Sequence, residues 1–200
     1  MKKILHIISS PRNGDSFSIK LGNAVIEKIQ AEYPGSTVKE SNLVKANFPH
    51  LEEAHLSSFF TPAESRTPEN WAAVKHSDGA IQDIMDADII VIGAPVYNFN
   101  IHSTLKAWID HIARAGITFK YGENGPVGLV QSKKVYIALA SGGVYSEGPM
   151  QSFDFVTPYL KAVLGFIGLK DITVFRVEGT SMPDLKEAAL AKGIGSINLN

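Results

Sequence analysis

Residues 87–94 read Ala87-Asp88-Ile89-Ile90-Val91-Ile92-Gly93-Ala94, and the chain continues as Pro95-Val96-Tyr97-Asn98-Phe99-Asn100. The first run is short, apolar and rich in β-branched side chains, which is typical of a strand that is buried on both faces. The second run places two aromatic rings and two amides where a strand usually turns through water into a helix. A helix is predicted directly afterwards, over about residues 102–114, because Leu105, Trp108 and Ile109 fall on one face. The region therefore predicts a buried strand, an unusual loop and an amphipathic helix in succession.

The same alternation of strands and helices extends in both directions along the chain. Residues 44–70 hold three prolines and are expected to form a surface insertion with short helical pieces, whereas residues 118–128 are expected to form a long connection. The run at 36–43 is more polar than the other strands and is expected at an edge of the sheet. Strands that alternate with helices predict a three-layer α/β domain, in which helices cover both faces of a parallel sheet. The remaining predicted strands cover residues 3–8, 36–43, 134–139 and 172–177, and the remaining predicted helices cover about residues 17–31, 71–85, 155–167 and 184–197.

The bulk composition favours one domain without a charged macromolecular partner. The chain has 200 residues and a net charge of −1, so residues 1–200 are predicted to form a single domain that binds neither nucleic acid nor a membrane. It contains no cysteine, which excludes disulfides and thiolate chemistry and fits a cytoplasmic protein. The apolar run after Lys2 and Lys3 ends at Ser9 and is too short for a signal peptide. No run approaches the roughly 20 apolar residues of a membrane span.

Three loops are expected to meet at one edge of the predicted sheet. Open parallel sheets bind ligands beyond the carboxyl ends of their strands, where the strand order reverses. The loops that follow the first, third and fourth predicted strands are residues 9–18, 95–100 and 140–145. The candidate site is therefore a pocket built from these three segments.

The first of these loops suits a phosphate group. It opens a helix, whose first N–H groups lack partners within the helix and carry partial positive charge. Neither a dinucleotide-binding glycine fingerprint nor a P-loop is present, but a monophosphate needs less than either of these motifs. The alternative is that Asp15 or Ser16 only caps the helix. The loop offers Ser9, Ser10, Arg12, Asn13, Ser16 and Ser18.

The other two loops suit a flat heteroaromatic ring. Tyr97 and Phe99 offer apolar faces, and the asparagines beside them offer polar groups for the edge of a ring. The alternative is that both aromatic side chains pack under the next helix while Asn98 or Asn100 caps it. In the third loop, the pair Gly142-Gly143 lets the backbone approach a ligand closely, although two glycines taken alone favour an ordinary strand-to-helix turn.

The spacing of the histidines argues against a metal site. His102 and His111 lie nine residues apart on the same predicted helix and do not share a face. His50, His55 and His76 are expected to be solvated. The chain also lacks the Gly-x-Ser-x-Gly elbow of a serine hydrolase, so neither metal chemistry nor triad hydrolysis is predicted.

Taken together, the loops resemble the FMN-dependent NADH-azoreductase and NADH:quinone oxidoreductase family of bacteria, in the flavodoxin-like superfamily. The similarity spans nearly the whole chain and is weakest in residues 44–70. The matching stretches are Ser9-Ser10, Ser16-Phe17-Ser18, Ala94-Pro95-Val96-Tyr97-Asn98-Phe99-Asn100-Ile101, Ala113-Arg114-Ala115-Gly116-Ile117-Thr118-Phe119, Glu123-Asn124-Gly125-Pro126-Val127-Gly128-Leu129, Gly142-Gly143, Thr157-Pro158-Tyr159-Leu160 and Leu164-Gly165-Phe166-Ile167-Gly168.

The resemblance implies a fold, a cofactor and a reaction. The fold would be a flavodoxin-like α/β sheet of five parallel strands in the order 2-1-3-4-5, with helices on both faces. Bound FMN would pass two electrons from NADH or NADPH to quinones and azo compounds by a ping-pong mechanism, in a homodimer that holds each flavin near the subunit interface. The chemistry would occur on the flavin, so no catalytic acid/base dyad is expected.

The same resemblance assigns residues to the cofactor. Ser10, Ser16, Phe17 and Ser18 would hold the phosphate. Pro95, Val96, Tyr97, Asn98 and Phe99 would line the isoalloxazine ring and the ribityl chain, and Ala140, Ser141, Gly142 and Gly143 would meet the pyrimidine edge. Phe119, Tyr121 and Tyr145 are candidates for the wall of the acceptor pocket.

Two departures from the family pattern concern the flavin's surroundings. Val96 stands where many members have methionine, and Ala140-Ser141 stands where many have Ser-Arg. The missing arginine bears on the flavin potential or the nicotinamide preference, and not on FMN binding, which backbone groups can still supply. Three alternatives remain from the sequence: an FAD-dependent quinone reductase, a flavodoxin-like electron carrier, and a non-catalytic module with a degenerate pocket. The near-neutral charge argues against the carrier, which is usually acidic.

Overall fold

The computed structural model describes residues 1–12 and 14–199. A five-stranded parallel sheet forms the centre of the molecule. The strand order is β2-β1-β3-β7-β8, so the predicted order 2-1-3-4-5 of a flavodoxin-like sheet is confirmed. Ile4 lies opposite Ile89, and Ile90 lies opposite Val135, which places the three apolar strands together in the middle. The strands are β1 (Lys3–Ile8), β2 (Thr37–Asn42), β3 (Ile89–Tyr97), β7 (Lys134–Ala140) and β8 (Asp171–Val177).

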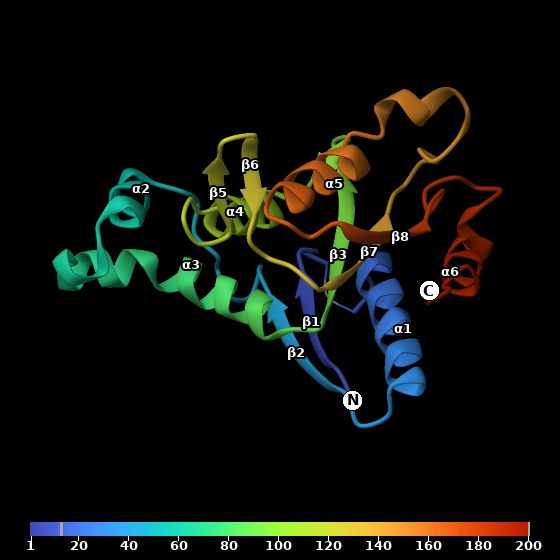
Figure 1. The fold of residues 1–200 in the computed structure, drawn as a ribbon. Helices are drawn as coiled ribbons and strands as arrows, with labels where there is room; N and C mark the ends of the chain where they lie inside the picture. The colour runs from blue at the N-terminus through green and yellow to red at the C-terminus, as the bar shows by residue number, and fades with distance from the viewer. Residues whose placement is uncertain (13, 200) are drawn as a thin grey trace.

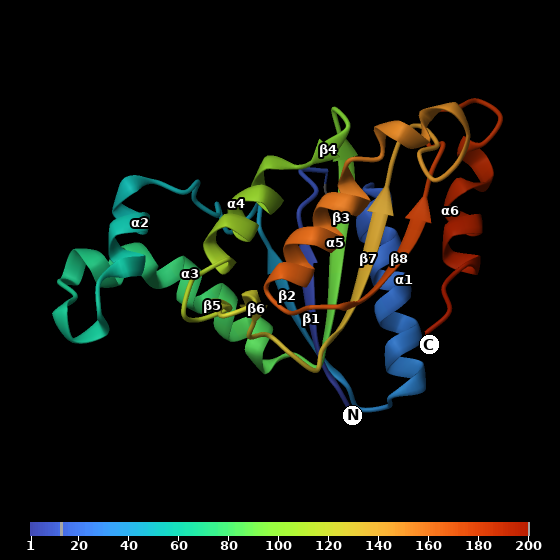
Figure 2. The same cartoon turned by 45° about the horizontal axis from the view of Figure 1, so that its top comes forward.

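The side chains of β3 alternate between two apolar cores. Ile90 and Ile92 belong to the core under α3 (Pro68–Asp86), α4 (Ser103–Ile112) and α5 (Val156–Phe166). Ile89 and Val91 belong to the core under α1 (Phe17–Glu32) and α6 (Lys186–Gly195). Successive side chains of a strand point to opposite faces, so a strand that is apolar at every position is covered on both sides. Figures 1 and 2 show these two helical layers on either side of the sheet.

Strand β2 lies at an edge, as its polar sequence predicted. Most of its side chains are exposed, and its backbone pairs with β1 alone. The helices of the described residues are too short or too polar to cross a lipid bilayer.

Two segments that were expected to be irregular form β-hairpins. Strand β3 continues three residues past the predicted end at Ala94 and turns back into β4 (Asn100–Ile101), with Tyr97 opposite Asn100. The segment 118–128, predicted as a long connection, contains β5 (Phe119–Gly122) paired with β6 (Gly125–Gly128). Each of these two strands has only four residues, and three of the eight are glycines. They therefore lack the alternation of apolar and polar residues that marks a strand in a sequence.

The region between β2 and α3 forms an arm that projects from the body of the molecule (Figures 1 and 2). It contains α2 (Glu53–Phe60) and the short 3-10 helix η1 (Ala63–Ser65), and a further 3-10 helix, η2 (Gly148–Phe153), follows β7. Helix α3 begins at Pro68, earlier than the predicted Trp71, because Thr67 accepts a hydrogen bond from the amide of Asn70 and caps the helix. Proline at the first helical position is compatible with this start, since its missing N–H would have no partner there.

Candidate functional site

The three loops named from the sequence lie together in one pocket at the carboxyl edge of the sheet. Its volume is about 250 Å³. Thr180 and Ser181, which follow β8, complete its wall and were missed in the sequence reading. Their position just after the last predicted strand could have identified them, since all parallel strands of a sheet end at the same edge. The lining residues are Ser10, Arg12, Ser16, Phe17, Pro95, Val96, Tyr97, Ala140, Ser141, Gly142, Thr180 and Ser181.

The helix α1 presents an uncapped N-terminus to this pocket. Ser16 occupies the cap position but makes no side-chain cap hydrogen bond within the described part of the chain; its Oγ lies 3.0 Å from the Oγ of Ser18 instead. Both serines are buried, and the side chain of Asp15 is fully exposed, 4.0 Å from Lys20. The alternative that the Ser16 side chain only caps the helix is therefore wrong. Asn13, also predicted for this loop, lies outside the described residues.

Free N–H groups at a buried helix start make a binding place for an anion. The first turn of α1 holds no acidic side chain, so nothing there repels a phosphate. Arg12 adds a positive charge at the rim of the pocket. The hydroxyls of Ser16 and Ser18 stand beside these amides and can donate to the same oxygens.

The second loop is a tight turn held in a strained backbone conformation. Asn98 and Phe99 have φ angles of 48° and 66°, the left-handed pair that a two-residue hairpin of type I′ requires. Asparagine tolerates this region, whereas phenylalanine rarely adopts it, and such strain is often found at ligand sites. The side chain of Phe99 is 42% exposed, so it does not pack under α4. The cap of α4 is His102, whose ring accepts a hydrogen bond from the amide of Thr104, and neither Asn98 nor Asn100 is the cap.

The third loop offers unpaired backbone amides. The carbonyls of Ser141, Gly142 and Gly143 accept hydrogen bonds from the amides of residues 180, 181 and 179, at 3.2, 3.0 and 3.1 Å. In a trans peptide the N–H points away from the carbonyl, so the amides that follow these carbonyls face the opposite side. Among the described residues, no partner accepts from the amides of Gly142, Gly143 and Val144. A Cβ at Gly142 would lie 2.8 Å from the hydroxyl of Ser181, so the Ser181 side chain would have to rotate away to make room for it.

These features fit the group that the resemblance implies. An anion site at the start of α1, an aromatic turn after β3 and free amides after β7 match the phosphate, the ring and the polar ring edge of FMN, respectively. Buried or partly buried N–H groups rarely stay without partners, so both sets of amides indicate that this pocket takes a ligand.

The three proposed acceptor-wall residues lie in two places. Tyr145 is half-buried beside Gly143, and its ring centroid is 6.2 Å from that of Phe99, next to the pocket. Phe119 and Tyr121 lie on the β5–β6 hairpin and are not among the pocket's lining residues. Phe119 is buried against Phe166, with ring centroids 4.4 Å apart, while Tyr121 is 75% exposed.

His111 is buried, and His55 is more buried than the sequence predicted. His111 is fully buried beneath α2, where its ring meets His55 at 4.8 Å between centroids, and burial lowers the pKa of His111 to about 4. His55 is therefore half-buried rather than solvated, whereas His50 and His76 are exposed as predicted. Burial of these rings follows from the insertion that covers α4, which the helix pattern alone does not reveal. Among residues 1–12 and 14–199, no group of three histidines or carboxylates is placed to hold a metal.

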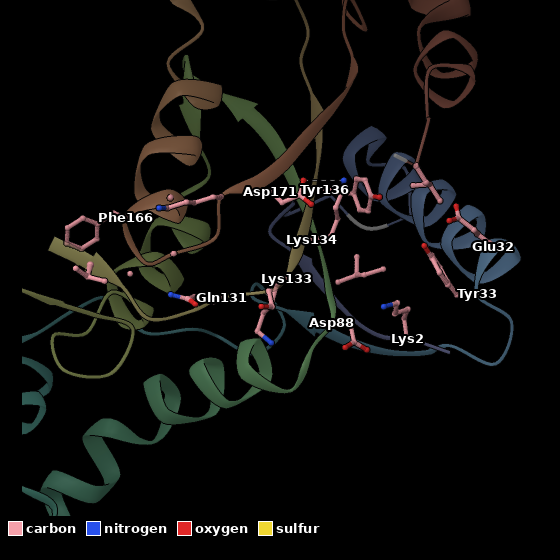
Figure 3. A pocket seen from close by; sticks show the side chains of 18 of the residues that line it. Lys2, Glu32, Tyr33, Asp88, Gln131, Lys133, Lys134, Tyr136, Phe166 and Asp171 are labelled. Atoms are coloured by element: carbon pink, nitrogen blue, oxygen red, sulfur yellow. Dashed lines mark ion pairs between the residues drawn. The ribbon is translucent and has the colours of Figure 1, made fainter.

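A larger groove, of about 740 Å³, lies at the other end of the sheet (Figure 3). Ile89, Lys134 and Asp171, which begin or nearly begin their strands, line it. Three of its charged side chains bind other parts of the protein: the Lys133 amine donates to the carbonyls of Met85 and Ala87, and Lys134 pairs with Asp171. Size alone would favour this groove, but it lies at the amino ends of the strands, which is the wrong end for ligand binding by a parallel sheet.

Known relatives match this chain over most of their length. A family model described as "Flavodoxin-like fold" matches residues 2–198. An FMN-dependent NADH:quinone oxidoreductase of Herminiimonas arsenicoxydans is 53% identical over 199 residues, which are 99% of this chain and 98% of that protein. A protein of the same name from Mesorhizobium japonicum is 46% identical, over 98% of this chain and 93% of that protein.

Solved structures of similar chains have the same architecture. The crystal structure of an azoreductase from Bacillus anthracis has a TM-score of 0.89 and 32% identity, and the match covers 98% of this chain and 96% of that one. An FMN-dependent NADH-azoreductase from Bacillus anthracis, solved in complex with FMN, has a TM-score of 0.84 and 29% identity over 98% of this chain and 97% of that one.

Proposed function

The chain belongs to the family of flavodoxin-like FMN-dependent NADH:quinone oxidoreductases and azoreductases, and from this premise we propose how its pocket works and which acceptors it takes. It is an oxidoreductase that uses FMN and NADH. The observation that carries the proposal is the convergence of an uncapped helix start and free loop amides in one pocket at the carboxyl edge of the sheet.

The cofactor is proposed to lie across the three loops. The amides of the first turn of α1 and the hydroxyls of the buried serines bind the phosphate, the turn after β3 lines the ring, and the glycine amides after β7 donate to its pyrimidine edge. The proposed contact residues are Ser10, Ser16, Phe17, Ser18, Pro95, Val96, Tyr97, Asn98, Phe99, Ala140, Ser141, Gly142 and Gly143.

Bound FMN supplies the two-electron transfer, and the residues around it control binding and charge. The Gly142 and Gly143 amides would donate to the polar edge of the bound ring and stabilise negative charge there, because fixed donors need no reorganisation. NADH and the acceptor are proposed to use the same open face in turn, which gives ping-pong kinetics. Quinones and azo compounds are the proposed acceptors. In the overall reaction NADH gives up a hydride and leaves as NAD⁺, and a quinone gains the equivalent of that hydride and one proton from solvent and leaves as the hydroquinone.

A homodimer is proposed from the exposed apolar side chains of the projecting arm. Phe60, Trp71 and Leu56 are 78%, 48% and 45% exposed on α2 and the start of α3. Large apolar side chains grouped on one arm are typical of an interaction surface. A second copy could also bring Phe119 and Tyr121 to an acceptor site that they do not reach within one chain. A cytoplasmic location is proposed from the absence of cysteine.

The function is tested by the cofactor content and the turnover of the purified protein. The proposal expects a yellow protein that releases FMN, loses its flavin colour on anaerobic addition of NADH, and regains it with a benzoquinone. Parallel lines in double-reciprocal plots against NADH and quinone would support the ping-pong order. Released FAD, or a protein that stays colourless after FMN is added, would refute the proposed cofactor site; intersecting lines would refute the kinetic order alone. Light scattering of wild-type and Phe60→Asp protein tests the dimer, which the variant should weaken.

A further inference from the structure

A buried carboxylate holds the far end of the loop that follows β7. Glu178, the first residue after β8, accepts hydrogen bonds from the consecutive backbone amides of Tyr145 and Ser146 at 2.8 and 3.0 Å. The hydroxyl of Ser146 donates to its other oxygen. The side chain of Glu178 is only 11% exposed, and hydrogen bonds to an ionised acceptor in such a place are stronger than neutral ones. The carboxylate therefore fixes two successive peptide groups of this loop.

Arg176 anchors this carboxylate to a second element. Its guanidinium lies 3.2 Å from Glu178 and 2.6 Å from Asp154, and it also donates to the hydroxyl of Thr157 at the start of α5. Burial opposes ionisation of Asp154, but the Thr157 amide and Arg176 outweigh it and lower the pKa of Asp154. The network is thus a chain of three side chains, linked by hydrogen bonds and short N···O contacts, that joins the end of β8, the loop after β7 and the start of α5.

The same loop carries the free amides of the pocket. Residues 179–181 hold the carbonyls of Ser141, Gly142 and Gly143, and Glu178 directly precedes that segment. The loop is therefore fixed at two places: by backbone bonds at its start, and by the Glu178 carboxylate two residues after Gly143. Gly142 and Gly143 lie between β7 and that carboxylate and contribute no side chain of their own to hold their orientation.

We propose that Glu178 is a positioning residue for the flavin: held by Arg176, it clamps the Tyr145–Ser146 end of the loop so that the Gly142 and Gly143 amides stay directed at the ring edge. The proposal rests on the proposed function, because it assumes that FMN occupies this pocket. Glu178 does not touch the cofactor itself. Glu178 orders the loop before the flavin binds, so the free energy of binding does not include the entropic cost of ordering it.

The test compares Glu178→Gln with wild-type protein after removal and re-addition of the flavin. Glutamine has the same shape but lacks the charge and one of the two acceptor oxygens. The Kd values of both FMN and riboflavin should rise by the same factor, about tenfold if roughly one residue must be ordered on binding rather than before. The midpoint potential of the bound flavin should become more negative, since weaker donors stabilise the reduced ring less. In the flavin-free protein, amide hydrogen exchange in residues 142–147 should become faster.

Ser77→Ala is the control for general destabilisation. It removes two buried hydrogen bonds outside the pocket, one that the Ser77 hydroxyl donates to the carbonyl of His111 and one that it accepts from Arg114. It should lower the melting temperature without changing the potential or either Kd. If Glu178→Gln does not fold, Arg176→Gln is measured in the same way, with the same shifts expected.

The outcomes separate this proposal from the proposed function. If wild-type protein binds FMN and the Glu178 variant keeps the wild-type Kd, potential and exchange rates, the positioning role is overturned while the function stands. If wild-type protein binds no flavin, both are overturned together. A lower melting temperature with an unchanged potential reduces Glu178 to a structural role and also overturns the proposal.

Discussion

Removing the two buried hydroxyls at the start of α1 should weaken FMN binding through its phosphate alone. In the double variant Ser16→Ala, Ser18→Ala, the backbone amides of the first turn remain, but two donors beside them are lost. A hydrogen bond to a charged group contributes about 1.5–3 kcal/mol. The lower end applies here because the two hydroxyls are within bonding distance of each other at 3.0 Å and regain part of that interaction when no phosphate is bound. The loss is then about 3 kcal/mol, or roughly 100-fold in Kd.

The assay is titration of the flavin-free protein with FMN and with riboflavin, followed by quenching of the flavin fluorescence. Riboflavin lacks the phosphate, so its Kd should be nearly the same in wild-type and variant protein. Ser9→Ala is a matched control: Ser9 is equally buried, but its hydroxyl donates to the carbonyl of Gly93 at 2.7 Å and should affect stability rather than the ratio of the two Kd values. An FMN-to-riboflavin Kd ratio that is the same in the double variant and the wild type would refute a phosphate site at this helix.

Three further outcomes are expected. Burial lowers the pKa of His6 from 6.5 to about 4, so the unfolded chain takes up a proton on this side chain at a higher pH than the folded chain does. The free energy of unfolding should therefore be unaffected above about pH 6.5 and should fall as the pH drops towards 4. The loss in the free energy of unfolding by pH 4 is about 3 kcal/mol. Urea unfolding between pH 7 and pH 4 should show a weaker pH dependence of this free energy for His6→Gln than for the wild type, and the same pH dependence in both would contradict the assignment. Gly128→Ala should destabilise the protein by about 1–3 kcal/mol, because the new Cβ would lie 2.2 Å from the amide nitrogen of Gly168; Gly165→Ala, with open space around it, should not lower the melting temperature. Phe119→Ala should change the ratio of kcat/KM for quinone and azo acceptors more than the FMN content, and an unchanged ratio would remove Phe119 from the acceptor site.

The central strands and their order follow from local sequence patterns. Ile89 to Ile92 are apolar at every position, so the strand must be covered on both faces, and the structure places its side chains in two cores. The polar pattern of residues 36–43 likewise predicted an edge strand, which the structure has at Thr37–Asn42. Because parallel strands share one carboxyl edge, the meeting of the three loops was predictable once the strands were known.

Features that depend on contacts between distant residues were not predictable in this way. The β5–β6 hairpin is fixed by the packing of Gly128 against Gly168, and nothing in its own residues alternates. The burial of His111 depends on the insertion that covers it. The clamp between Glu178 and the Tyr145 amide joins residues 33 positions apart, and a lone glutamate after a strand gives no local signal of such a role.

The most direct test of the cofactor site is a crystal structure of the protein grown with FMN. The phosphate should lie within hydrogen-bonding distance of the first amides of α1, and the pyrimidine edge of the ring should face the amides of Gly142 and Gly143. Flavin bound instead in the groove at the amino ends of the strands, beside Lys133 and Asp88, would contradict the assignment of the pocket.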